Sequence, residues 1–198
     1  MPKSLAKLTS NIVNPFLVSF VVIILLSFES TSSTSDALKW AAISVALSVL
    51  PVFSVVVYLV QNKKLEGIFV NPRHQRHKLY LLASALAVVG CVVLFYLGAP
   101  RLLMAAFVAG LAAIVIFMGI NFWWKISLHT AFVAASVTVL IIVFNPVGAW
   151  TVVLLPAVAW ARMEMGQHSP AQVAGGAVLS AVVVVVVFWL FGLIVGIL

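Results

Sequence analysis

Long apolar runs separated by short polar segments occupy most of the 198-residue sequence. A membrane-spanning helix needs about 20 apolar residues, so each run of that length predicts a transmembrane helix. The predicted spans are residues 12–28, 37–60, 79–97, 102–120, about 130–144, 147–161 and 173–198. The pattern predicts an all-α polytopic membrane bundle of about seven transmembrane helices, with six as the alternative, forming one integral membrane domain over residues 1–198.

Helix-breaking residues mark the irregular points of these runs. Asn14-Pro15 interrupts the first run, Pro51 predicts a kink in the second, and Pro156 lies inside the short sixth run. Residues 98–100 and 145–146, which carry glycine, proline or asparagine, predict turns between neighbouring spans.

Composition narrows the possible functions. The chain is 65% hydrophobic and only 8% charged, unlike a soluble domain. Its net charge of +7 is not carried by a polar surface domain, so we expect membrane lipids or an anionic substrate as partners and no nucleic acid. The single cysteine, Cys91, excludes a disulfide within the chain and a thiolate metal cluster. Only four acidic residues are present, and we expect no metal and no other cofactor.

The order of the seven spans predicts which polar segments share a side of the membrane. Residues 61–77, 121–128 and 162–172 are separated by two spans each, so they open on one face, together with the N-terminus. That face carries most of the basic residues: Lys3, Lys7, Lys63, Lys64, Arg73, Arg76, Lys78, Lys125 and Arg162. The opposite face carries Lys39 and Arg101, so the positive-inside rule places the basic face in the cytoplasm.

Residues 161–176 combine a cation, a titratable ring and a predicted helix start. Arg162 and His168 are separated by five residues. Ser169-Pro170 is typical of a helix N-cap followed by proline at the first helical position, and Gln172 completes a possible capping box. The free N–H groups and the positive dipole end of such a helix favour an anion, so the segment predicts a phosphate site near His168.

Two other segments of the same predicted face add polar side chains. One carries Lys125, Ser127 and His129, and the other carries Arg73 and Arg76. Arginine binds phosphoryl oxygens in a bidentate manner, lysine adds a point charge, and serine donates one hydrogen bond. Two histidines could divide the chemistry, one attacking phosphorus and the other protonating the leaving oxygen.

Two of these segments resemble signatures of the type 2 phosphatidic acid phosphatase superfamily. "ARMEMGQHSPAQVAGG" resembles the third signature, which is arginine, five residues, histidine, three residues and aspartate, and "KISLHT" resembles the second, with a serine-glycine-histidine core. The resemblance covers a phosphatase-like core from about residue 61 to the end. It implies that His168 is the nucleophile and forms a phosphohistidine, that His129 is the general acid, and that Ser127 and Arg162 bind phosphate without a metal.

The sequence departs from the family pattern at three places. The first signature, lysine, six residues and arginine-proline, is not intact, so Arg73 and Arg76 are candidates by location only. Leu128 stands at the glycine position of the second signature, and Lys125 could supply the cation that the first one lacks. Gln172 stands where an aspartate normally orients the nucleophile; its amide oxygen can accept an imidazole N–H but stabilises an imidazolium less.

The expected function is therefore hydrolysis of a lipid phosphate, or of an isoprenyl phosphate or diphosphate, at the membrane interface. The alternatives are a lipid phosphotransferase, a non-catalytic lipid-phosphate binder or transporter, and a metal or haem protein that uses His129 and His168. The lipid and the oligomeric state are left open.

Purely structural roles compete with the functional ones. Ser127 could cap a helix and Gln172 could serve only the capping box, while residues 122–124 are typical of an interfacial aromatic belt. Residues 175–176, both glycine, predict close packing of two helices.

Overall fold

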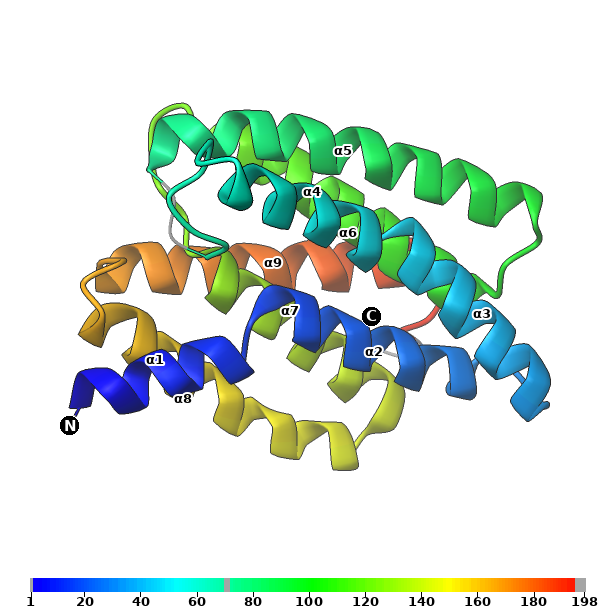
Figure 1. Cartoon of the computed structure of the whole chain (residues 1–198). Helices are drawn as coiled ribbons and strands as arrows, with labels where there is room; N and C mark the ends of the chain where they lie inside the picture. The colour runs from blue at the N-terminus through cyan, green and yellow to red at the C-terminus, as the bar shows by residue number, and fades with distance from the viewer. Residues whose placement is uncertain (1, 70–71, 195–198) are drawn as a thin grey trace. The chain divides into compact units, whose positions relative to one another are not determined.

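The structure, a computed structural model, describes residues 2–69 and 72–194, without the side chains of residues 73 and 74. Every regular element in the described part is a helix, which confirms the all-α prediction (Figure 1). The elements are α1 (Pro2–Ile12), α2 (Pro15–Glu29), α3 (Thr34–Leu47), α4 (Val49–Gln61), α5 (Arg73–Tyr96), α6 (Arg101–Ile120), α7 (Leu128–Phe144), the 3-10 helix η1 (Val147–Val153), α8 (Leu154–Glu164) and α9 (Pro170–Leu190).

The interruption at Asn14-Pro15 separates α1 from α2. The side-chain oxygen of Asn14 accepts hydrogen bonds from the backbone N–H of Phe16 at 2.9 Å and of Leu17 at 3.0 Å. Asn14 thus caps α2, whose first residue is Pro15, a position that needs no N–H donor.

The kink predicted at Pro51 corresponds to a break in the second apolar run, whereas Pro156 lies inside the first turn of its helix. The second apolar run is divided at Ser48, between α3 and α4, because Pro51 has no N–H to donate one turn back. Pro156 is the third residue of α8, in a first turn whose N–H groups have no intrahelical partner. The turns predicted at residues 98–100 and 145–146 both lie between helices.

The chain forms two compact units. Unit 1 combines the N-terminal segment up to Val22 with the chain from Lys125 onward, and unit 2 runs from Ile23 to Trp124. Unit 1 contains most of the candidate site residues: Lys125, Ser127, His129, Arg162, His168 and Gln172. Arg73 and Arg76 belong to unit 2.

Helix α7 is the centre of unit 1. It lies beside α9 and also packs against α8 and η1 (Figure 1). Val133 and Val137 of α7 form a buried cluster with Val158 of α8, which Ile141 and Leu154 surround.

Gly176 allows α7 and α9 to approach closely at the end where both helices begin. A Cβ atom at this position would lie 2.8 Å from the backbone oxygen of Ser127 and 3.1 Å from Cγ2 of Ile126. Backbone cannot move aside as a flexible side chain can, so the predicted close packing is confirmed at Gly176.

Two hydrogen bonds fix the register of the same contact. The backbone N–H of Ser127 donates to the carbonyl oxygen of Gln172 at 3.3 Å. The hydroxyl of Thr130 donates to the carbonyl oxygen of Val173 at 3.2 Å. The start of α7 is therefore attached to the first turn of α9.

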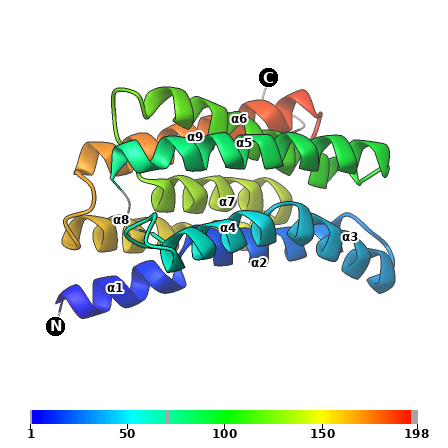
Figure 2. The ribbon, with the colours of Figure 1, turned by 45° about the horizontal axis from the view of Figure 1, so that its top comes forward.

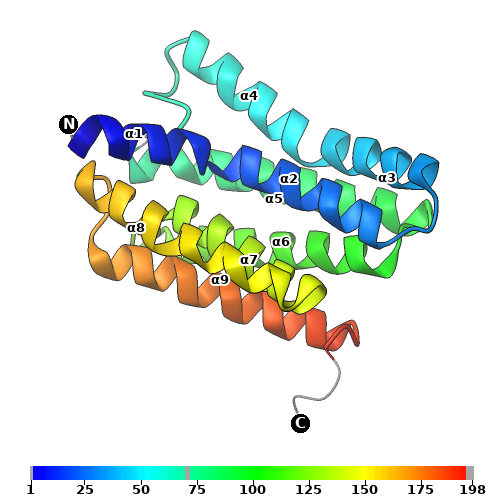
Figure 3. The same ribbon diagram turned by 90° about the horizontal axis from the view of Figure 1, so that it is seen from below.

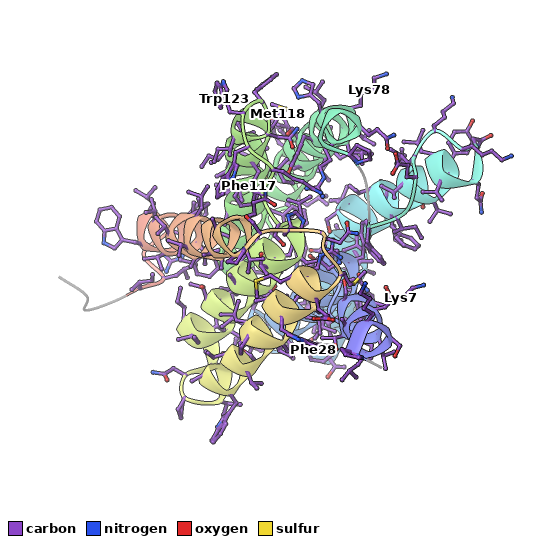
Figure 4. All side chains as sticks on the ribbon, turned by 90° about the vertical axis from the view of Figure 1, so that its left-hand side faces the viewer. Lys7, Phe28, Lys78, Phe117, Met118 and Trp123 are labelled. Carbon is purple, nitrogen blue, oxygen red and sulfur yellow. The ribbon has the colours of Figure 1, made fainter. Side chains whose placement is uncertain are left out.

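Unit 2 is built around the pair α5 and α6 (Figure 2). The turn between them contains Gly98, whose φ of +69° favours glycine. Phe117 of α6 is buried, whereas Lys78 and Trp123 point outward (Figure 4).

Several helices of the described residues could cross a membrane. Five stretches are long and apolar enough: Pro2–Glu29, Thr34–Gln61, Gln75–Tyr96, Arg101–Ile120 and Pro170–Leu190. A shorter apolar helix is Leu128–Phe144. These helices indicate a multi-pass membrane protein. The predicted count of seven spans is not confirmed, because residues 147–161 form a 3-10 helix followed by the short helix α8.

Large exposed side chains also suit a lipid environment. Phe122 and Trp123, which follow α6, are 57% and 79% exposed, and Tyr96 at the end of α5 is 82% exposed. Such aromatic residues are typical of the interface between bilayer and water.

We predict that Gly176→Ala lowers the stability of the protein by about 1–3 kcal/mol, because the new methyl group displaces the start of α7. Gly110→Ala is the matched control, since a Cβ at Gly110 meets no atom within 4 Å. Thermal unfolding in detergent measures both variants. Equal stability of the two would contradict the close contact of α7 and α9.

Candidate functional site

The candidate residues of unit 1 gather where α8 ends and where α7 and α9 begin (Figure 3). Arg162 lies in the last turn of α8, and His168 lies in the loop just before α9. Ser127 immediately precedes α7, and His129 is its second residue. Helix ends from three parts of the chain thus meet in one region of this unit.

Arg162 is the largest fully buried side chain of the described residues, with 1% of its surface exposed. Its Nη1 donates a hydrogen bond of 2.9 Å to the hydroxyl of Ser10, which is also 1% exposed. A buried cation is costly unless polar groups or an anion compensate it. The fold therefore holds a positive charge inside this end of unit 1.

His168 is buried and held in one orientation by Gln172. Its Nδ1 lies 3.0 Å from Oε1 of Gln172, and the backbone N–H of Ser169 donates to the same oxygen at 3.3 Å. An amide oxygen only accepts hydrogen bonds, so Nδ1 of His168 carries the hydrogen of this bond. In the neutral ring the lone pair is then on Nε2.

The predicted capping box is confirmed. The hydroxyl of Ser169 accepts a hydrogen bond from the backbone N–H of Gln172 at 3.3 Å, and Pro170 is the first residue of α9. Gln172 therefore has both of the roles that the sequence left open: it caps α9 and it orients His168. The positive end of the α9 dipole lies beside the His168 loop.

Ser127 occupies the N-cap position of α7 but does not cap the helix with its side chain. Its hydroxyl is fully buried and has no hydrogen-bond partner among the described residues. Buried hydroxyl groups are normally paired, so one that is not paired suits a site that accepts a polar ligand.

Lys125 connects the segment just before α7 with the loop between α8 and α9. Its Nζ donates a hydrogen bond of 3.1 Å to the carbonyl oxygen of Gln167, next to His168. The backbone N–H of Gln167 in turn donates to the carbonyl oxygen of Arg162 at 3.1 Å. The ammonium group of Lys125 thus lies against the loop between Arg162 and His168.

His129 is buried, with 4% of its surface exposed. In the sequence it lies between Ser127 and Thr130, and both of these residues bind α9. Ser127 does so through its backbone N–H and Thr130 through its hydroxyl. The start of α7 that carries His129 is therefore attached to the start of α9, just after His168.

The other two candidate residues, Arg73 and Arg76, lie in the first turn of α5 in unit 2. Arg73 is the first residue of α5, and its side chain lies outside the described part of the structure. Arg76 is buried beside the hydroxyl of Tyr80. Their roles remain predictions from the sequence.

No protein-family model, curated protein or solved structure matches this chain. Among the described residues, no group of three or more His, Cys, Asp or Glu side chains is placed to hold a metal ion. The arrangement of the side chains in unit 1 is therefore the basis for a functional proposal.

The sequence did not identify Ser10 as a site residue. Its spacing from Ala6, four residues earlier, was a usable signal, because small residues four apart let helices pack closely. Both residues are buried on the side of α1 that packs against α8.

We predict different outcomes for two serines that both precede a helix. Ser169→Ala loses a capping hydrogen bond and should destabilise the protein by about 1 kcal/mol. Ser127→Ala loses no hydrogen bond of the described structure and should change stability by less than about 0.5 kcal/mol. Unfolding by heat or by SDS compares the two variants. If Ser127→Ala lowered the stability as much as Ser169→Ala does, the Ser127 hydroxyl would have a structural role instead.

Proposed function

We propose that the protein is a metal-independent lipid-phosphate phosphatase, a divergent relative of the type 2 phosphatidic acid phosphatases that it resembles. The observation that supports this most is the geometry of His168. Gln172 binds Nδ1, so the lone pair is on Nε2, in the same region as the buried Arg162 and the buried Ser127 hydroxyl.

In the first step of the proposed reaction, Nε2 of His168 attacks phosphorus and forms a phosphorus–nitrogen bond. The bond between phosphorus and the oxygen of the leaving group breaks, and His129 donates a proton to that oxygen. Water then attacks phosphorus and gives one proton to His129, while the phosphorus–nitrogen bond to His168 breaks. Inorganic phosphate leaves, and both histidines return to their starting forms.

Stabilisation of charge on the phosphoryl oxygens provides most of the rate in such reactions. Arg162, Lys125 and Ser127 are the proposed ligands of these oxygens, assisted by the N-terminus of α9. The phosphate-binding roles of Arg73 and Arg76 stay predictions from the sequence.

The substrate would lie with its apolar tail in the bilayer. Helix α9 exposes the apolar side chains Val178, Val182 and Trp189, a surface suited to lipid. We also propose that the chain crosses the membrane seven times and that the phosphate site faces the cytoplasm. Phosphatidate, phosphatidylglycerophosphate and isoprenyl phosphates all combine such a tail with a terminal phosphate.

One observation favours a second candidate, a lipid-phosphate binder without catalysis. The partner of His168 is the neutral amide of Gln172, which stabilises a developing imidazolium less than a carboxylate does. Binding of a lipid phosphate without release of phosphate would favour this candidate.

We predict that His168→Asn lowers phosphate release by at least about three orders of magnitude, because the nucleophile is lost. The assay uses purified protein in detergent, with EDTA, and the three lipid classes as substrates. His77→Asn is the matched control, since His77 packs against Phe122 in unit 2. Full activity of the His168 variant, with folding intact, would exclude the mechanism.

We also predict that Gln172→Glu raises kcat by about threefold to tenfold, because a carboxylate stabilises the imidazolium of His168 better. Glutamate also fits the capping box, so the start of α9 should keep its structure. Steady-state kinetics with the preferred lipid measures the change. A rate at or below that of the wild type would contradict the proposed role of residue 172.

A further inference from the structure

The N-terminal helix packs against the helix that carries Arg162. Helix α1 lies beside α8 within unit 1 (Figure 3). Its buried face consists of Ala6 and Ser10, whereas Lys3 and Lys7 are exposed. The small buried side chains let α8 come close enough for Arg162 to reach the backbone-proximal hydroxyl of Ser10.

The contact between Ser10 and Arg162 is polar and fully enclosed. Nη1 of Arg162 donates to the Ser10 hydroxyl at 2.9 Å, and both side chains are 1% exposed. A hydrogen bond that involves a charged donor is stronger than a neutral one, and enclosure from water strengthens it further.

The guanidinium group is planar, so holding one nitrogen restricts the orientation of the whole plane. A bidentate contact with two phosphoryl oxygens requires that plane to be aligned with the ligand. The Ser10 hydroxyl can therefore influence the affinity of Arg162 for a phosphate through the orientation of the guanidinium plane.

We propose that Ser10 is a positioning residue of the phosphate site, and that α1 is therefore a functional part of it. This inference rests on the proposed function, in which Arg162 binds the phosphoryl group. Ser10 acts through Arg162: it orients the guanidinium before the ligand arrives. Losing it should weaken both the binding of a phosphate group and the stabilisation of charge on its oxygens during the reaction.

Two variants and one control test this proposal. Ser10→Ala removes the hydroxyl that accepts the hydrogen bond from Arg162. Ser10→Cys replaces it with a thiol of similar size, whose sulfur is a much weaker acceptor. Asn11→Ala is the control, because the Asn11 side chain is exposed on the same helix. Thermal unfolding without ligand verifies that each variant is folded.

The first measurement is the affinity for orthovanadate, a phosphate mimic. Binding is detected as a rise in the melting temperature of the protein. Both Ser10 variants should bind orthovanadate about tenfold more weakly, as expected for the loss of a charge-assisted hydrogen bond. The control should bind like the wild type. Wild-type affinity in either folded Ser10 variant would overturn the proposal, as would a wild type that does not bind orthovanadate.

The second measurement separates this proposal from the proposed function. With an active wild type, the Ser10 variants should lower kcat/KM about tenfold, because Arg162 then binds the phosphoryl oxygens less well before and during the reaction. A wild-type kcat/KM in a folded Ser10 variant would overturn the positioning role. If the wild type binds orthovanadate but releases no phosphate from any lipid, the proposed catalysis fails, and weaker binding by the Ser10 variants still supports the positioning role.

Discussion

The close contact between the starts of α7 and α9 determines where the candidate groups of unit 1 lie. Gly176 leaves room for the backbone of Ser127, and the N–H of Ser127 binds the carbonyl oxygen of Gln172. His129 follows Ser127 by two residues, and His168 precedes Gln172 by four. One backbone contact therefore brings both histidine-bearing segments to the same end of the unit. A larger residue at position 176 would separate them.

A buried cation is the second constraint. Arg162 is enclosed at the end of α8, and its partner Ser10 comes from the opposite end of the sequence. Burying a charge lowers stability unless polar groups or an anion compensate it. In the proposed function, an anion bound beside Arg162 would add to the compensation that the Ser10 hydroxyl provides.

Local features of the sequence predicted the local features of the structure. The spacing of Ser169, Pro170 and Gln172 predicted the capping box, and the prolines predicted the helix boundaries, because short-range hydrogen bonds determine both. The pairing of Ser10 with Arg162 joins residues 152 positions apart, and no local pattern encodes it. The irregular form of residues 147–161 likewise depends on tertiary packing, as does the Ser127 hydroxyl, which has no hydrogen-bond partner in the described part of the chain. Hydrophobicity alone predicted apolar segments correctly but did not establish how many of them cross the membrane.

In the proposed function, the ends of α7, α8 and α9 together form one phosphate site. A structure of the protein with bound tungstate, a heavy phosphate mimic, tests it most directly. We predict tungstate next to Nε2 of His168, with the Arg162 guanidinium and the Ser127 hydroxyl bound to its oxygens. Tungstate bound away from these three groups, or a structure in which they do not share an anion, would exclude this phosphate site.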